Sequence, residues 1–432
     1  MSRLFVLILS IFFLNQCSLN EGSRLWKDNQ KEIDNQTNIK KVFLEEKKIT
    51  TEFNKDLKLN LKEINTNNKI LSNSNNYGIQ DYNGSIKQVR KYKFSNLKDV
   101  NQLDFKPIFL NDGLIFFDKK GTIIRYDNKN KVLWKKNFYT KSEKKLNPKL
   151  NFVINDKNLL ITDSIAKYYS VNIISGKLNW SKNNNYPFNS EIKKSKNKIF
   201  AIDYNNTLRC YNIVDGSECW SLKTEESFTI STSKFSLIII NNLVIFSNSI
   251  GDITAVDIGT GLITWQLPTQ SSSIKNETYN FKFSKLVSDN KSIYFSNNKN
   301  QFYSVDIKSG ATNWINKINS NLAPIISGNL IFTVSNEGYL YVIEKNNGNI
   351  IRISDLYSNY KNKKRKNIKP VGFAIGNTKL YLTNTNGKMI VADLELGKVI
   401  RIEKVSGNLA SRPFIFNQNL FIIRNGSIIQ YN

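Results

Sequence analysis

The stretch that decides the fold is Gly251-Asp252-Ile253-Thr254-Ala255-Val256-Asp257-Ile258-Gly259-Thr260-Gly261-Leu262-Ile263-Thr264-Trp265. Alternating apolar residues lead into Asp257, which is typical of a β-strand. Gly261 can adopt the left-handed backbone conformation that closes a tight turn, and the return strand ends in the large aromatic Trp265. The stretch therefore predicts two β-strands joined by a tight turn.

This phrase recurs along the chain. Residues 166–180, 206–220 and 300–314 keep its length and its terminal Trp, whereas 338–352 and 387–401 keep the turn and end in Arg. A shorter copy has Asn130 where the turn Gly is expected. We call the seven terminal residues the blade-end residues: Trp134, Trp180, Trp220, Trp265, Trp314, Arg352 and Arg401.

The blade-end residues follow one another at intervals of 46, 40, 45, 49, 38 and 49 residues. Intervals of about 40–50 residues are typical of a four-stranded propeller blade. A helical solenoid would require amphipathic periodicity between these residues, and the sequence has none. We therefore predict an all-β fold, a β-propeller of four-stranded antiparallel blades whose Trp side chains pack between blades.

The two ends of the repeat region give the number of blades. The last phrase begins at Gly426 and stops at Asn432, before its return strand. An open propeller would leave an unpaired strand edge, so the missing strand is best supplied from the N-terminal side. Residues 86–92 alternate suitably, with Tyr92 as the blade-end aromatic. Seven complete repeats and this shared blade predict an eight-bladed propeller, closed by an N-terminal strand that completes the last blade.

The N-terminus predicts export. Residues 1–16 contain Arg3 and an apolar run of 11 residues, 4–14, which suits a signal peptide and is too short to span a bilayer. The run ends in Leu14-Asn15-Gln16-Cys17, which resembles a bacterial lipobox and implies lipidation of Cys17. Gln16 departs from the small residue of that motif. The residue after Cys17 is Ser rather than Asp, which implies an outer-membrane anchor. The alternative is an ordinary signal peptide with an incidental cysteine.

Residues 17–83 are rich in Asn, Lys and Glu and carry no repeat. Such a composition cannot bury enough apolar surface to fold alone. We predict a lipidated, mostly disordered tether, in which the alternating residues 57–61 are a candidate extra strand. Residues 84–432 are then one propeller domain.

The chain is strongly basic, with 62 Lys and Arg against 35 Asp and Glu and a net charge of +27. This charge attracts polyanions, although abundant Lys, Asn and Ile also suggest an AT-rich genome. The densest cluster, residues 361–366, is either a solvated loop or a contact for phosphates of lipid or lipopolysaccharide. No nucleic-acid partner is expected of an exported protein that lacks a nucleic-acid motif.

Nothing in the sequence predicts catalysis. The chain has no His, which excludes His-based triads and His metal sites. Asp257, Asp306 and Asp393 recur at one repeat position, which marks them as turn residues bonding nearby backbone amides. We expect no catalytic residue, no cofactor and no metal.

Cys210 and Cys219 form a candidate disulfide. If the turn pairs Asn212 with Ser217, Cys210 falls directly opposite Cys219, at nearly the separation that a disulfide requires. An oxidising periplasm would favour the bond. The alternative is two small apolar side chains that never meet.

Phrases such as Tyr169-Ser170-Val171-Asn172-Ile173-Ile174-Ser175-Gly176-Lys177-Leu178-Asn179-Trp180 resemble the PQQ-type propeller repeat. An exported lipoprotein built of eight such repeats is similar to the BamB family of the bacterial outer-membrane β-barrel assembly machinery. This resemblance implies a non-enzymatic scaffold at the periplasmic face of the outer membrane. The implied partners are the barrel-forming core subunit, unfolded outer-membrane proteins, and the membrane through an N-terminal lipid.

The same resemblance implies a partner contact in the loop after a mid-chain blade-end Trp, here residues 221–232. Phe228 and Ile230 would supply the aliphatic contacts of the family. The Arg of the family is absent, and Lys234 is a poor substitute for it. Alternatively, Phe228 and Ile230 only begin the next blade.

Two rival functions come from other classes. A PQQ- and Ca²⁺-dependent quinoprotein dehydrogenase would carry an adjacent Cys pair, which this chain lacks. A binding module for polysaccharide or peptidoglycan is suggested only by the basic charge.

Overall fold

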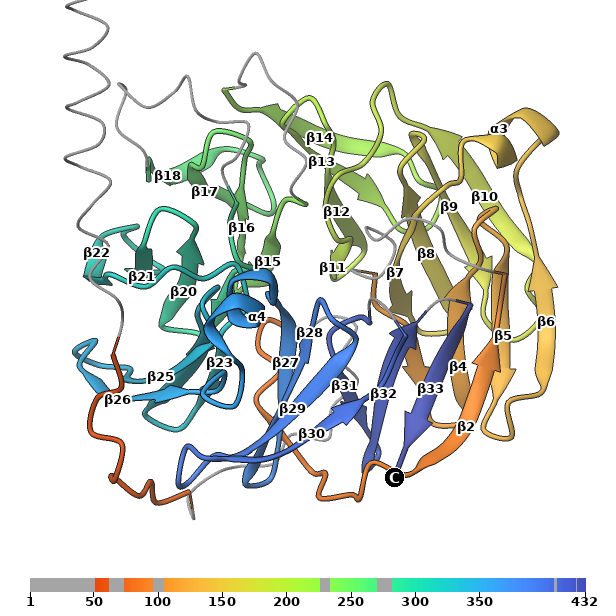
Figure 1. The fold of residues 1–432 in the computed structure, drawn as a ribbon. Coiled ribbons are helices and arrows are strands. Elements are labelled where there is room, and N and C mark those ends of the chain that lie inside the picture. Colours follow the sequence, from red (N-terminus) through yellow and green to blue (C-terminus); the bar gives the residue numbers. More distant parts are fainter. Residues whose placement is uncertain are drawn as a thin grey trace, which may run out of the picture. The chain divides into compact units, whose positions relative to one another are not determined.

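The computed structural model describes residues 51–61, 74–95, 105–225, 234–269, 282–407, 410–424 and 426–432. From Glu52 to Asn432 these residues belong to one compact unit. That unit is an eight-bladed β-propeller, as the sequence predicted (Figure 1). Each blade has four antiparallel strands, which follow chain order in blades 1 to 7, and the seventh blade has a fifth strand. The first strands of neighbouring blades contact one another, which places them innermost, around the axis.

Blades 1 to 4 follow directly along the chain. Their strands are β3 (Ile108–Leu110), β4 (Gly113–Phe117), β5 (Ile123–Asp127) and β6 (Val132–Lys136); β7 (Leu150–Asn155), β8 (Asn158–Asp163), β9 (Lys167–Asn172) and β10 (Leu178–Asn183); β11 (Lys193–Ser195), β12 (Lys198–Ile202), β13 (Thr207–Asn212) and β14 (Glu218–Lys223); β15 (Leu237–Ile240), β16 (Leu243–Ser247), β17 (Ile253–Asp257) and β18 (Ile263–Leu267). The short helix α3 (Lys141–Lys145) joins the first two blades.

Blades 5 to 8 complete the ring. Their strands are β19 (Val287–Ser288), β20 (Ser292–Asn297), β21 (Gln301–Asp306) and β22 (Thr312–Asn316); β23 (Ile325–Ser327), β24 (Leu330–Val334), β25 (Tyr339–Glu344) and β26 (Ile350–Asp355); β27 (Pro370–Gly376), β28 (Lys379–Asn384), β29 (Lys388–Asp393) and β30 (Val399–Lys404), with β1 (Ile79–Gln80); and β31 (Phe414–Phe416), β32 (Asn419–Arg424) and β33 (Ser427–Tyr431), with β2 (Gln88–Lys93). Helix α4 (Asn362–Asn367) joins blades 6 and 7.

The ring is closed by the predicted N-terminal strand. Strand β2 pairs antiparallel with β33, and the two lie side by side in Figure 1 although they come from opposite ends of the chain. Tyr92 was predicted to be the blade-end residue of this blade, and that prediction was wrong. A bulge shifts the register and pairs Arg90 with Gln430. Arg90 therefore occupies the position of the blade-end residues, while Tyr92 is buried two residues further on against Tyr126.

The blade-end Trp residues join each blade to the next. Every indole N–H donates a hydrogen bond to a backbone carbonyl in the turn of the following blade. The pairs are Trp134 with Ile173 (2.9 Å), Trp180 with Ile213 (3.1 Å), Trp220 with Ile258 (3.1 Å), Trp265 with Ile307 (2.8 Å) and Trp314 with Lys345 (3.1 Å). The prediction that these rings pack between blades is confirmed.

Arginine replaces Trp without losing this contact. Arg352 is fully buried, and its guanidinium donates to the carbonyl oxygen of Leu394 in the turn of blade 7 at 2.6 Å. Arg401 donates to the carbonyl oxygen of Ser85 at 3.0 Å, just ahead of the strand that completes blade 8. Both side chains keep a planar N–H donor at the position of the indole, which explains why the repeat tolerates the exchange.

The turns behave as the repeat predicted. The Asp257 carboxylate accepts hydrogen bonds from the backbone N–H groups of Gly259 and Thr260, both at 2.9 Å. Asp306 and Asp393 accept equivalent bonds in their own blades. Asn130 adopts a φ of 60°, so it does take the place of the turn Gly in blade 1.

Residues ahead of the predicted propeller boundary also pack on the blades. Leu59 and Leu61 are buried in the apolar cluster of blades 6 and 7, and the Leu59 N–H donates to the Glu395 carbonyl oxygen at 3.0 Å. Phe53 forms a bridge with Ile353 on the edge of blade 6. The alternating pattern of residues 57–61 therefore reflects docking. The signal segment and residues 17–50 lie outside the described residues.

The contact between the turn Gly and the preceding Trp can be tested at Gly261. Its φ is +76°, and a Cβ there would lie 2.7 Å from the Trp220 ring. We expect Gly261→Ala to lower the free energy of unfolding by about 2–4 kcal/mol, from backbone strain and overpacking together. Gly328→Ala is the matched control, because Gly328 has a φ of +55° and nothing within 4 Å of the added Cβ. Urea unfolding should give a loss of only about 1 kcal/mol for this control. Equal losses would contradict the packing argument.

Candidate functional site

Charged side chains from several blades come together near the propeller axis, where the innermost strands begin. Lys106, Glu191, Lys285 and Arg412 each stand two residues ahead of an innermost strand, namely β3, β11, β19 and β31. Lys193 opens β11, and Lys234 stands three residues ahead of β15. We call these six residues the axial cluster. Because the repeat sets the start of each inner strand, residues far apart in sequence come together here.

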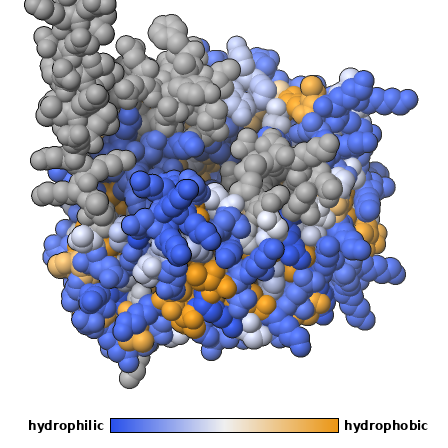
Figure 2. Space-filling view, viewed as in Figure 1, coloured by the Kyte–Doolittle hydropathy of each residue, from blue (hydrophilic) through white to orange (hydrophobic). Residues whose placement is uncertain are grey.

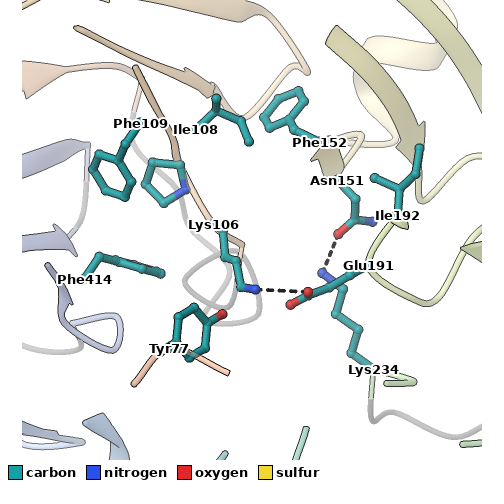
Figure 3. Close-up of a pocket in the computed structure, with 11 residues that line it drawn as sticks. Tyr77, Lys106, Ile108, Phe109, Asn151, Phe152, Glu191, Ile192, Lys234 and Phe414 are labelled. Atoms are coloured by element: carbon teal, nitrogen blue, oxygen red, sulfur yellow. Dashed lines mark hydrogen bonds and ion pairs between the residues drawn. The ribbon is translucent and has the colours of Figure 1, made fainter. Parts of the chain in front are cut away.

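Glu191 is the acidic centre of the axial cluster. Its carboxylate accepts from the Lys106 ammonium at 3.0 Å and also pairs with Lys285 (Figure 3 shows the Lys106 pair). Burial alone would raise the pKa of Glu191, but Lys106, Lys285 and the other surrounding ammonium groups hold it well below its usual range. Glu191 is therefore ionised.

An N-terminal segment, residues 74–82, runs along the inner strands of several blades. The Asn75 carbonyl accepts from the N–H of Ser288 in β19 at 3.2 Å, and the Asn76 amide exchanges two hydrogen bonds with the backbone of Ile326 in β23. Strand β1 then pairs in parallel with β27. We call residues 74–82 the inner segment.

The inner segment places Tyr77 among the cations. The Lys106 ammonium lies 4.7 Å from the centroid of its ring, and the Arg412 guanidinium 4.0 Å. The Tyr77 hydroxyl is buried close to the Lys106 ammonium, but it makes no hydrogen bond of ordinary geometry among the described residues. Burial would raise the pKa of Tyr77, but the charges of Lys106, Lys285 and Arg412 outweigh it and lower the pKa to about 8.

The axial cluster carries an excess of positive charge. Five cationic side chains surround one carboxylate, and burial together with the neighbouring Lys106 lowers the pKa of Lys193 to about 8. A cavity of about 30 Å³ lies between the cluster and a set of aromatic and aliphatic side chains (Figure 3). Its lining consists of Tyr77, Lys106, Pro107, Ile108, Phe109, Asn151, Phe152, Glu191, Ile192, Lys234 and Phe414.

Several residues singled out in the sequence lie elsewhere. Cys17, Phe228 and Ile230 fall outside the described residues. The basic cluster at 361–366 forms most of helix α4, where Arg365 pairs with Asp355 at 2.6 Å and the remaining side chains are exposed. Among the described residues, no three His, Cys, Asp or Glu side chains gather as metal ligands, and no helix is long and apolar enough to cross a membrane.

The expected register of the two cysteines was wrong. The turn does pair Asn212 with Ser217, but a bulge follows, so Cys210 lies opposite Trp220 and Cys219 occupies the bulge. Both are free thiols in the structure, Cys210 buried and Cys219 exposed. The two thiols still interact, and burial followed by this contact raises the pKa of Cys210.

The sequence carried a signal for the axial cluster that the repeat analysis missed. The blade-end residues lie in the last strand of each blade, whereas these charged residues precede the first strand. Aligning the chain on its inner strands places Lys106, Glu191, Lys285 and Arg412 at one common position. Tyr77 had no such signal, because the inner segment is not part of a repeat.

The disulfide between Cys210 and Cys219 remains a prediction. We expect peptide mapping under non-reducing conditions to link the two residues in protein isolated from an oxidising compartment, because their thiols interact across one hairpin. After reduction, alkylation of the folded protein should modify exposed Cys219 and spare Cys210. Free thiols at both positions in the isolated protein would contradict the bond.

The low pKa of Tyr77 gives a direct optical test. Among the 19 tyrosines, we expect one to show phenolate absorbance with a midpoint near pH 8, because the surrounding cations favour the ionised form. Tyr77→Phe should remove that step, and Tyr186→Phe, at an exposed site, should leave it. A titration without a step near pH 8 in the wild type would contradict the description of the cluster.

Comparison with solved structures confirms the architecture. BamB from Moraxella catarrhalis matches with a TM-score of 0.63 at 16% identity, over 80% of this chain and 99% of that one. The computationally designed Ika8 protein gives 0.62 at 13% identity, over 81% and 99%. The quinohemoprotein alcohol dehydrogenase ADHIIG from Pseudomonas putida HK5 gives 0.57 at 9% identity, over 86% and 78%. At these identities the likeness shows the fold alone.

Sequence comparison is more specific. No curated protein matches the chain significantly. The profile of one family, described as outer membrane protein assembly factor BamB, matches residues 119–354. This match spans more than half of the 432 residues and runs from the middle of blade 1 to the last strand of blade 6. The chain therefore belongs to the family of the outer membrane protein assembly factor BamB.

Proposed function

We propose that this protein is a non-enzymatic scaffold subunit of the machinery that assembles β-barrel proteins in the outer membrane. It binds the barrel-forming core subunit and aids the insertion of unfolded outer-membrane proteins. The observation that carries this proposal is the match of residues 119–354 to the BamB family. The architecture supports it, because a closed ring of eight blades offers broad, rigid faces for a partner.

The proposed position in the cell rests on the family match and on the N-terminal sequence. Export with lipidation of Cys17 would anchor the protein at the periplasmic face of the outer membrane. A tether of this kind confines the propeller near the bilayer and raises the effective concentration of any membrane-bound partner. The face in Figure 2 is mostly hydrophilic, with smaller hydrophobic patches, which suits a protein held by its tether.

The partner contact is proposed in the loop that follows Trp220, where Phe228 and Ile230 supply the apolar side chains. Lys234 does not take part, because it points into the axial cavity and donates to the Asn151 side chain (Figure 3). Its ammonium also lies 3.8 Å from the centroid of the Phe105 ring. The contact would therefore rest on Phe228 and Ile230.

Unfolded outer-membrane proteins would meet the outermost strands. In β14 most residues are exposed, and the strand has a partner, β13, on one side only within its sheet. An edge of this kind can pair with an incoming extended segment through backbone hydrogen bonds. This gives the scaffold a sequence-independent contact for its clients.

The alternative of a quinoprotein dehydrogenase requires a site for PQQ and Ca²⁺. The cavity at the axis holds about 30 Å³, enough for two or three water molecules, whereas the cofactor is a tricyclic quinone. Tyr77 of the inner segment forms part of the wall of this cavity. The residues of this cavity do not fit that cofactor, which favours the scaffold.

Co-purification tests the proposal. We expect tagged protein, solubilised in mild detergent, to retain a large outer-membrane barrel protein with repeated periplasmic domains, identified by mass spectrometry. Recovery of glycan-processing enzymes instead, or of no partner, would contradict the scaffold and favour a binding module.

The same capture tests the partner contact. We expect Phe228→Asp together with Ile230→Asp to lower the recovery of the barrel protein at least tenfold, because charges would replace the apolar contact. Ile400→Asp, at an exposed site of blade 7, is the matched control and should retain the partner. Circular dichroism must show that both variants are folded. Unchanged recovery with the double variant would reject these two residues.

A further inference from the structure

The axial cluster is an unusual place for unbalanced charge. Among the described residues that line the cavity, Glu191 is the one carboxylate, and it lies close to Tyr77, Lys106 and Lys193. Lys234 and Arg412 add two further cations beside the same cavity. Buried charges are normally paired, because transfer of an ion out of water is costly. The excess of cations therefore favours an additional anion.

Two polar groups at this site make no hydrogen bond of ordinary geometry among the described residues. They are the Tyr77 hydroxyl and the Nε–H of Arg412, both buried. Arg412 lies against the rings of Tyr77 and Phe414 and makes one long hydrogen bond, 3.4 Å, to the Phe373 carbonyl. Buried donors are normally satisfied, so these two groups point to a ligand or to ordered water.

The cavity beside them has a matching size and lining. Its volume of about 30 Å³ exceeds what one water molecule requires and suits a single small group. Tyr77, Lys106 and Lys234 line it, and the rings of Phe109 and Phe414 close its opposite side (Figure 3). Glu191 also lines it, but its charge is already shared by Lys106 and Lys285.

We propose that this cavity is a binding site for a small oxyanion, a single carboxylate or phosphate group held by Tyr77, Lys106 and Lys234. The ammonium groups supply charge-assisted donors, and the Tyr77 hydroxyl supplies a neutral one. The site goes beyond the scaffold function and does not depend on it. Because it lies at the junction of the inner segment with several inner strands, a bound anion would also hold that segment in place.

A bound anion competes with the phenolate form of Tyr77, because both neutralise the charge of the same cations. An oxyanion at the site lowers the positive potential that favours the phenolate, and it accepts a hydrogen bond only from the neutral hydroxyl. Binding must therefore shift the ionisation of Tyr77 to higher pH. Salt that screens the cations would shift the ionisation in the same direction, so the comparison must be made at constant ionic strength.

Calorimetric titration with inorganic phosphate and with acetate, at constant ionic strength set by chloride, tests the site in the full-length protein. We expect saturable binding of at least one of them. Lys234→Gln should weaken it at least tenfold, and Lys364→Gln, an exposed residue of α4, should leave it unchanged. Acetate alone would assign a carboxylate, and phosphate alone a phosphate group. Failure of both to bind, or equal binding by all three proteins, would overturn the proposal.

A second measurement keeps the test valid if Lys234→Gln does not fold. In the wild type, we expect the ligand that binds to raise the midpoint of Tyr77 ionisation by about one pH unit relative to chloride alone. Tyr77→Phe, which lacks the phenolate, identifies the step. A midpoint that neither phosphate nor acetate moves would mean that the cavity holds only water.

Discussion

The structure depends on the hydrogen bond from each blade-end side chain to a backbone carbonyl in the next blade. The indole N–H of Trp220 donates to the carbonyl oxygen of Ile258. The guanidinium of Arg352 donates to that of Leu394, at the equivalent position of its own blade. Each contact also places a flat side chain against the turn, where Gly261 leaves the necessary space. Because the contact recurs from blade to blade, it fixes how far each sheet is rotated relative to its neighbour.

That rotation determines what meets at the axis. Four of the inner strands are preceded at the same position by a charged residue, and these four side chains meet in a common space. They are Lys106, Glu191, Lys285 and Arg412. For this reason Lys106 and Arg412, from the first and the last blade, both lie against the Tyr77 ring. The exposed charges of helix α4 are well solvated and contribute little to stability, whereas the buried charges at the axis must be balanced locally. The positive charges of the chain therefore affect stability differently on helix α4 and at the axis.

The fold could be read from the sequence because the repeat is local. Eight blades, the closing strand and the turn role of Asp257 all follow from one phrase and its spacing. The errors arose from single-residue bulges, which put Arg90 where Tyr92 was expected and Cys219 out of line with Cys210. A bulge inserts one residue without a strong sequence signal, so pairing arguments fail at that point.

The axial site could be predicted only in part. The common position of Lys106 and Arg412 ahead of their inner strands is visible once the strands are aligned. The position of Tyr77 beside these two cations is not visible in the sequence, because the inner segment belongs to no repeat. That segment is held by contacts to the backbone of β19 and β23. Its placement depends on tertiary contacts that no local pattern encodes.

The closure of the ring by β2 and β33 has a consequence for how the chain folds. These strands stand at opposite ends of the propeller sequence, so their pairing requires contacts of very large sequence separation, which form slowly. The inner segment and β2 are synthesised before every blade, whereas their partners β27 and β33 follow only about 290 and 340 residues later in the chain. Until the final residues arrive, β2 lacks its partner β33 and keeps an open edge of the kind that pairs with other chains. The protein thus passes through an incomplete ring before its C-terminal strand can complete it.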